Sequence, residues 1–364
     1  MTAAGESLRN AAEYLAVEQR NALRAGAYGV ESSGDSGRSD TEEVLTTIQS
    51  VADAVAENAT TWAGNAERYV AEDLDGGTDA RTVMYAHAAA IQTDVEHLLS
   101  GHEFKASSVV FGILPLGHSN ACVLKHDMQG RELDQPLIVV NWGLVLALRS
   151  LFTAFAIYLS GESLSDNWRA LSRQEFINAV RRYESPTAQT MAETEFTPPD
   201  DWTLGIADEL GVWAGSFQSV VLWFIALHEV GHIVNGDTDG ANSVARLSAV
   251  GSEVELSYAR PQTEALANWP CELAADRFAL TWLCDWGSDR PSRWSNTAQV
   301  VVFFRWLMTV EHRRGSPLSP YHPPANQRLA ELIASATILA GSPMPPEDQH
   351  VIDSAFQLWT EASL

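Results

Sequence analysis

The 364-residue sequence is poor in lysine, which occurs only at Lys105 and Lys125, and its formal net charge is −24 at pH 7. Such an acidic surface repels nucleic acid and anionic lipid, so neither is expected as a partner. The charge is typical of a surface that keeps a protein soluble. A basic protein substrate would also suit it.

Cysteine is scarce as well, with single residues at Cys122, Cys271 and Cys284 and no C-x-x-C pair. An odd and sparse set of cysteines argues against a disulfide framework and indicates a reducing compartment. The first twenty residues have no apolar core flanked by positive charge, so no signal peptide is expected. These features together predict a cytoplasmic protein.

Long apolar runs are few, and only residues 137–159 and 217–234 need to be considered as membrane spans. The first run contains Asn141, Arg149 and Ser150, and the second contains two histidines and a glutamate. Because polar and ionisable groups are costly at membrane depth, both runs are interpreted as buried core elements. We therefore expect no integral membrane span.

Helical spacing of apolar residues dominates the first hundred residues, over 5–25, from 41 onward, and over 79–99. A Gly/Ser-rich linker is predicted at 26–40. The sequence therefore predicts an acidic helical N-terminal region, residues 1–103, followed by one larger domain, residues 104–364.

The larger domain begins with short segments rich in β-branched residues. Strands are expected at 107–116, 121–124 and 136–141, which predicts a small antiparallel sheet. Further helices are predicted over 142–159, 173–183, 217–234, 270–286 and 297–312, from 326, and up to 359. The predicted fold class is α+β, mainly α, and 46% hydrophobic with 19% charged residues fits a globular protein.

The predicted helix 217–234 carries the motif His228-Glu229-Val230-Gly231-His232. Residues four apart share one face of a helix, so the two histidines can hold one metal ion between them. Glu229 lies one step round, where its carboxylate can reach a water near that ion. This H-E-x-x-H pattern indicates two zinc ligands and a general base. Taken alone, the motif also occurs by chance.

A catalytic zinc needs a third protein ligand and an open position. The short extension of the motif would require histidine at position 238, which is Thr238. Glu272 and Asp276 lie i and i+4 on a later predicted helix that is small and apolar around them. Glu272 is therefore the candidate third ligand, and Asp276 is placed to accept the free ring N–H of a ligand histidine. The alternative is two solvated charges on a helix surface.

Hydrolysis of a peptide bond also needs a group that stabilises the carbonyl oxygen as it becomes negatively charged. His322, in a Tyr-His-Pro-Pro loop, and Arg328, six residues later, are the candidates for this role. A His-Pro pair before a helix and an arginine within it are also common surface features.

These motifs together resemble those of the gluzincin metallopeptidases of the prenyl-protein protease and HtpX type: HEVGH, then ELAAD, then HPPANQR. The segments around Asn120, Ala121 and Cys122 and over 138–144 resemble the family's Asn-Ala strand and the following strand-to-helix step. The resemblance implies a zincin-like core, Glu272 as the third zinc ligand, and His322 with Arg328 as the carbonyl-binding pair. It also implies that residues 120–123 form an edge strand to which a peptide substrate can pair.

The sequence departs from that family in two ways. We expect no membrane spans here, and a long polar stretch, residues 160–215, precedes HEVGH. A soluble branch similar to Lit-type phage-exclusion peptidases fits the missing spans better. We therefore predict a cytoplasmic zinc endopeptidase with one Zn²⁺ per chain, held by His228, His232 and Glu272. The alternatives are a non-catalytic, zinc-stabilised binding or regulatory protein and a helical interaction protein with accidental motifs.

Overall fold

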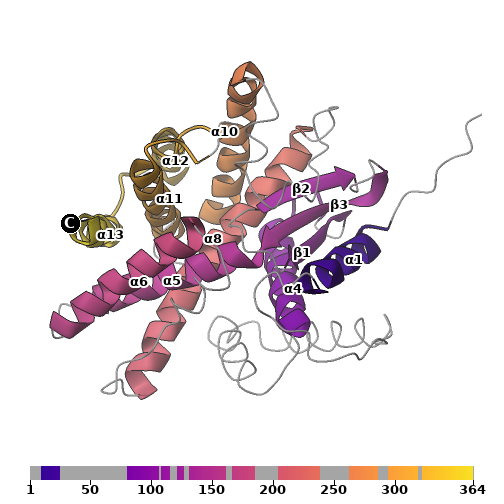
Figure 1. Ribbon diagram of the computed structural model, residues 1–364. Helices are drawn as coiled ribbons and strands as arrows, with labels where there is room; N and C mark the ends of the chain where they lie inside the picture. Colours follow the sequence, from indigo (N-terminus) through magenta and orange to yellow (C-terminus); the bar gives the residue numbers. More distant parts are fainter. Residues whose placement is uncertain are drawn as a thin grey trace, which may run out of the picture.

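The computed structural model describes residues 10–24, 80–105, 108–114, 121–126, 131–160, 166–184, 204–237, 262–285, 294–318 and 322–363. It is mainly helical and contains one three-stranded sheet (Figure 1). The elements in chain order are α1 (Ala11–Arg24), α4 (Ala80–Leu98), β1 (Val110–Leu114), β2 (Ala121–His126), β3 (Glu132–Asn141), α5 (Trp142–Ser160), α6 (Asp166–Glu184), α8 (Leu204–Val234), α10 (Gln262–Asp285), α11 (Trp294–Arg314), α12 (Ala325–Ala340) and α13 (Pro346–Ser363).

Most of the predicted elements are confirmed, but several begin earlier than predicted. Helix α8 begins at Leu204, thirteen positions before the predicted start, and β3 begins at Glu132, four positions before it. Helix α6 begins at Asp166, seven positions before the predicted start. Helix α10 begins at Gln262, so Pro270 lies inside the helix and not in its first turn as predicted. The predicted linker 26–40 and the predicted helical segment from 41 lie outside the described residues, and the division of the chain at residue 103 stays a prediction.

The predicted antiparallel sheet is wrong in one of its two pairings. The strand order is β1-β3-β2, and β3 is antiparallel to β2 but parallel to β1. Strand β3 is the central strand, and its residues 137–140 are all buried because both faces of the strand are covered. The prediction assumed that consecutive strands pair as hairpins, whereas β1 pairs with β3 and not with β2.

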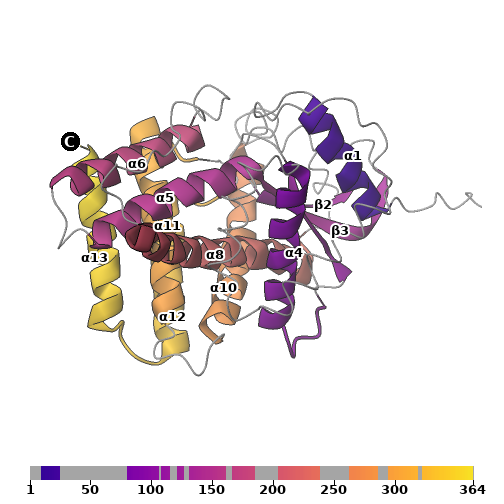
Figure 2. The ribbon, with the colours of Figure 1, turned by 90° about the horizontal axis from the view of Figure 1, so that it is seen from below.

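The side chains of β3 alternate between two apolar clusters, as the two-residue period of a strand requires. Leu137 and Val139 contact the cluster that includes Tyr14 and Leu15 of α1. The other face, which includes Ile138 and Val140, belongs to the main core that α4, α5 and α8 share. Figures 1 and 2 show α1 and α4 beside the sheet at one end of the molecule and α6 and α13 at the other end.

Helices α5 and α8 form the centre of the main core. Over Trp142–Ser160 and Val212–Val234 they are long and apolar enough to cross a membrane by length and composition alone. In each stretch 67% of an 18-residue window is buried inside the protein. Helix α8 is packed against α4, α5, α10 and α11, which is the environment expected of a core helix.

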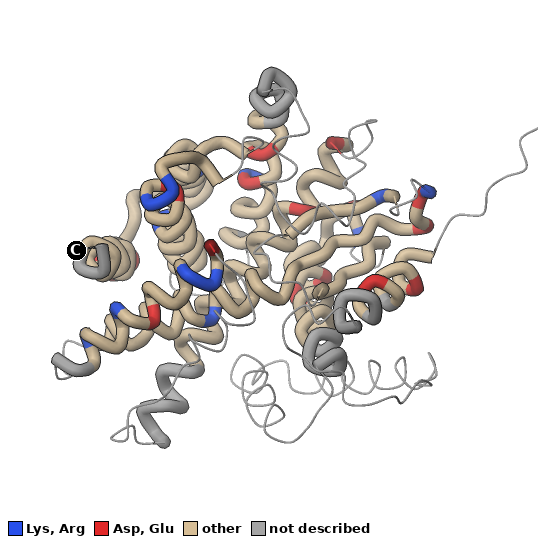
Figure 3. Tube along the Cα trace, viewed as in Figure 1, with Lys and Arg blue, Asp and Glu red and all other residues tan. Residues whose placement is uncertain are grey.

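The charged residues of the described chain are unevenly distributed. Figure 3 shows most Lys and Arg positions on α5, α6, α11 and α12, whereas Asp and Glu positions occur in both halves of the molecule. Arg328 of α12 differs from a surface arginine because its side chain is only 12% exposed. It points inward, to a buried acid described below.

Candidate metal centre

Helix α8 places the HEVGH motif near its C-terminal end. His228 and Glu229 are buried, and His232, one turn later, is half-buried. The helix ends in a turn in which Gly236 adopts a φ of 75°, a left-handed conformation that favours glycine. The backbone N–H of Asp237 then donates to the carbonyl oxygen of His232 (3.0 Å), which folds the chain back over the motif.

Helix α10 approaches α8 closely at this point. A Cβ atom at Gly231 would lie 3.0 Å from the Cα atom of Ala275, so two small residues set the separation of the helices. Glu272 and Asp276 flank Ala275 on α10 and are both buried. The small apolar residues around these two acids therefore bring them to the histidines instead of leaving them in solvent.

Three donor groups converge between the two helices. His228 Nε2 lies 3.1 Å from His232 Nε2 and 3.3 Å from Glu272 Oε2, and His232 Nε2 lies 3.4 Å from Glu272 Oε1. In a tetrahedral zinc site with bonds of about 2.0–2.1 Å, neighbouring ligand atoms lie roughly 3.3 Å apart. The spacing of the three donors therefore fits a metal ion of this size and geometry.

The outer nitrogen of each histidine faces a carboxylate. His228 Nδ1 lies 2.9 Å from Asp276 Oδ1, and His232 Nδ1 lies 3.1 Å from Asp237 Oδ2. Each Nδ1 thus carries the proton and donates it, which leaves a lone pair on each Nε2. Two lone pairs and a carboxylate that face one another call for a cation. In agreement, Glu272 Oε2 is buried and accepts no hydrogen bond from the described residues.

The electrostatics of the cluster favour a positive charge between its members. Burial alone would lower the pKa of His228, but the hydrogen bond with Asp276 and the contacts and charges of Asp276 and Glu272 outweigh burial and raise this pKa to about 10. Burial would raise the pKa of Glu272, but the charge of His322 and contacts with His228 and His232 hold it well below its ordinary value. Without a metal ion the cluster therefore binds a proton, and the two compete for the same site.

Asp276 connects His228 to Arg328. Arg328 donates from Nε to Asp276 Oδ2 (2.8 Å) and from its terminal nitrogen to Asp276 Oδ1 (2.6 Å). Its guanidinium also lies 4.9 Å from the centre of the Phe304 ring. The predicted role of Arg328 at a substrate carbonyl stays a prediction, because the contacts found here join it to Asp276.

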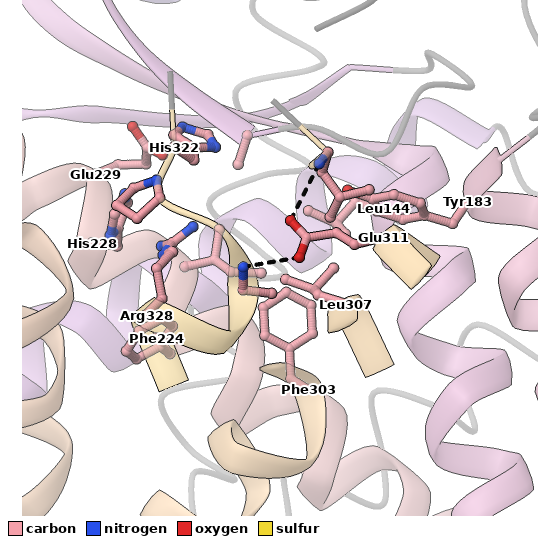
Figure 4. A pocket seen from close by; sticks show the side chains of 15 residues that line it. Leu144, Tyr183, Phe224, His228, Glu229, Phe303, Leu307, Glu311, His322 and Arg328 are labelled. Carbon is pink, nitrogen blue, oxygen red and sulfur yellow. Dashed lines mark hydrogen bonds between the residues drawn. The ribbon is translucent and has the colours of Figure 1, made fainter. Parts of the chain in front are cut away.

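His322 reaches the same cluster from the loop before α12. Its Nε2 lies 3.3 Å from Glu272 Oε2, and its side chain is 35% exposed, which leaves it accessible from solvent. Figure 4 shows His322, Glu229, His228 and Arg328 gathered at one end of a pocket. The pocket has a volume of about 100 Å³, and apolar side chains that include Leu144, Phe303 and Leu307 line its other side.

The predicted substrate strand lies beside this pocket. Ala121 lines the pocket, and Ala121 and Cys122 belong to β2, which forms one edge of the described sheet. Asn120 lies outside the described residues. Cys122 packs instead against the cluster that includes Tyr14 and Leu15 of α1. The other proposed residues come together from α8, α10, β2, α12 and the segment before α12.

Two polar residues of the site were not predicted. Asp237 follows the helix that carries the motif, and an Asn-Gly-Asp sequence there indicated only the end of the helix. Glu311 of α11 lines the pocket, and no local pattern distinguishes it from a surface glutamate. Asp237 had one usable signal, since a residue that follows a left-handed glycine turns back toward the last helical turn.

A family model matches part of the chain. Residues 165–343 match a family model described as Peptidase U49, the Lit-like metallopeptidases. Neither the curated proteins nor the solved structures gave a significant match. The matched part of the chain contains HEVGH, Glu272, Asp276, His322 and Arg328. It supports a peptidase, a hydrolase that acts on peptide or protein substrates, and it agrees with the resemblance to Lit-type peptidases seen in the sequence.

Proposed function

We propose that the protein is a zinc-dependent endopeptidase whose metal ligands are His228, His232 and Glu272. The observation that carries this proposal is the convergence of three donor atoms 3.1–3.4 Å apart, beside Glu229 in the same pocket. A site built only to stabilise the fold needs no carboxylate next to the metal. The match to a peptidase family supports the same reaction.

Two neutral histidines and one carboxylate are the donor set of hydrolytic zinc sites with an open position. When bound there, Zn²⁺ supplies a Lewis acid that polarises a carbonyl and lowers the pKa of a water. Asp276 and Asp237 hold the two imidazoles in the tautomer that offers Nε2. Arg328 keeps Asp276 charged and oriented.

Glu229 acts as the general base. Its carboxylate accepts the proton of the attacking water and then gives that proton to the nitrogen of the leaving amine. His322 donates a hydrogen bond from its ring to the carbonyl oxygen as negative charge develops there. A substrate in extended conformation pairs with β2 along Ala121 and Cys122, which presents one peptide bond to these groups. The reaction takes place in the cytoplasm.

The test compares wild-type protein with Glu229→Gln, both loaded with zinc, on a proteome-derived peptide mixture. New peptide termini are counted by mass spectrometry. We expect the wild type to produce them and Glu229→Gln to lose about 10²–10⁴-fold in rate, because a general base contributes that much. The variant keeps its zinc, since all three ligands are intact. Glu331→Gln, on the exposed surface of α12, removes the same charge and serves as the control.

Each contrary outcome has a definite meaning. New termini formed at the same rate by Glu229→Gln would exclude Glu229 as the base. A wild type that binds zinc tightly, unfolds when zinc is removed and cuts nothing would instead support the zinc-stabilised binding protein.

A further inference from the structure

Glu311 faces the pocket from α11, three residues before the end of that helix. Its Oε1 accepts the backbone N–H of Leu318 (3.2 Å), and its Oε2 accepts the backbone N–H of Ala325 (3.0 Å). Figure 4 shows both bonds as dashed lines beside the metal-binding end of the pocket. One carboxylate thus joins two points of the chain that are seven residues apart, and His322 lies between them.

The N-terminus of α12 lacks a cap of its own. Its N-cap residue is Pro324, which makes no side-chain capping bond, and the first N–H groups of a helix have no partner within the helix. Glu311 supplies this partner from another helix, at Ala325. A carboxylate is well suited to this position because the start of a helix carries partial positive charge.

An acid in a substrate pocket has two obvious alternative uses, as a second general base or as a partner for a basic substrate side chain. Here each oxygen of Glu311 already accepts a main-chain N–H. The other side chains near it in the pocket, such as Tyr183, Leu307 and Leu318, are apolar or aromatic. The contacts of Glu311 therefore connect helix α11 to the backbone of the segment that carries His322.

We infer that Glu311 is a positioning residue that holds His322 beside Glu229 and Glu272, and this inference rests on the proposed role of His322 in hydrolysis. The loop is attached to the rest of the site at a second place, because Arg328 joins α12 to α10 through Asp276. Removal of Glu311 thus leaves α12 docked and the metal ligands intact. It releases the bonds on either side of His322.

The functional test is a double-mutant cycle on a peptide that the zinc-loaded wild type cleaves. His322→Ala is expected to lower kcat by about 10²–10³-fold, the cost of one oxyanion donor. Glu311→Ala lowers kcat by about 10-fold or more with little change in KM, because a small displacement of a catalytic group is costly. Glu311→Gln, whose amide oxygen still accepts one N–H, recovers part of this loss.

The double variant decides between positioning and general structural support. If Glu311 acts through His322, adding Glu311→Ala to His322→Ala changes kcat less than about twofold. If the two losses multiply, the inference is wrong. Glu331→Ala, which removes an exposed glutamate of α12, is the matched control and leaves kcat unchanged.

A second measurement separates this inference from the proposed function. The rate at which diethyl pyrocarbonate modifies His322 is followed by mass spectrometry in the zinc-loaded wild type, Glu311→Ala and Glu331→Ala. We expect a severalfold faster modification in Glu311→Ala alone, with zinc content unchanged. An unchanged rate overturns the inference. If the wild type cleaves no peptide, the proposed function fails, while the modification rates still decide whether Glu311 holds His322.

Discussion

Two aspartates pack against α8, and their surroundings differ. Asp276 of α10 is buried beside His228, and burial would raise its pKa, but the Arg328 charge and its hydrogen bonds lower the pKa to about 2. Asp94 of α4 accepts a hydrogen bond from Trp223 Nε1 (2.8 Å), and burial raises its pKa to about 6 in spite of this bond. The pKa of the same side chain is thus lowered in one place and raised in the other.

The difference shows how the protein separates a functional carboxylate from a structural one. A neutral indole N–H is too weak to offset the loss of hydration that burial imposes on a charge. A guanidinium that donates two hydrogen bonds offsets it fully, and the charge is then available to orient His228. At the metal centre the chain supplies such a cation, Arg328, to the buried Asp276.

Removal of the Asp276 carboxylate is expected to have the largest effect on zinc affinity and on stability. Asp276→Ala leaves the Arg328 guanidinium without its buried partner and His228 without its acceptor. We expect zinc affinity to fall about 10–100-fold and the free energy of unfolding to fall by roughly 3–5 kcal/mol. Competition with a chromophoric chelator and urea unfolding measure the two effects. Asp276→Asn keeps an acceptor for His228, so its zinc affinity should fall less than that of Asp276→Ala. Equal zinc affinity in the wild type, Asp276→Ala and Asp276→Asn would contradict the role of Asp276.

Replacement of Asp94, the structural aspartate, is expected to raise the free energy of unfolding instead of lowering it. Because the pKa of Asp94 is higher in the folded protein than its ordinary value, its contribution to the free energy of unfolding is complete below about pH 4 and is lost as the pH rises through about 6. Asp94→Asn cannot ionise and still accepts the Trp223 N–H. The variant should be more stable than the wild type by about 3 kcal/mol above pH 7, and the difference should shrink toward pH 4.

Urea unfolding at several pH values measures this difference. Glu96→Gln, at an exposed position of the same helix, is the control and should show no such dependence. A constant difference between pH 4 and pH 8 would show that Asp94 does not titrate as the structure implies.

The smallest effect is expected at the second carboxylate of the centre. Asp237 orients His232 from a turn, and its side chain is 19% exposed whereas that of Asp276 is 5% exposed. Water can replace it in part, so Asp237→Ala should lower zinc affinity by about tenfold with little loss of stability. Asp237→Asn should recover most of this affinity. If Asp237→Ala lost as much zinc affinity and stability as Asp276→Ala, the more exposed aspartate would matter as much as the buried one, and this prediction would be wrong.

The centre of the site could be predicted from the sequence because its parts are local. His228 and His232, and likewise Glu272 and Asp276, share a helical face at i and i+4, and such spacing is visible without a structure. The small apolar residues around the two acids favoured a close approach to another helix, and the structure shows that approach between Gly231 and Ala275. His322 and Arg328 were proposed from order along the chain, and the structure shows that they come together with the others.

The rest depends on tertiary contacts that no local pattern encodes. Glu311 bonds backbone groups of another segment, and Arg328 reaches Asp276 across two helices. The parallel pairing of β1 with β3 joins strands that are not consecutive in the chain, so no local turn signal indicates it. Pro270 indicated a first turn, yet tertiary packing keeps α10 helical through a residue that has no N–H for the carbonyl of Leu266.

Zinc bound per chain, measured by mass spectrometry of the metal after dialysis, tests most directly whether His228, His232 and Glu272 form one site. The structure predicts about one zinc per wild-type chain, a loss of most of it in Glu272→Ala and His228→Ala, and full retention in Glu331→Ala. A wild type without zinc, or a full equivalent of zinc in a variant that lacks all three side chains, would contradict it.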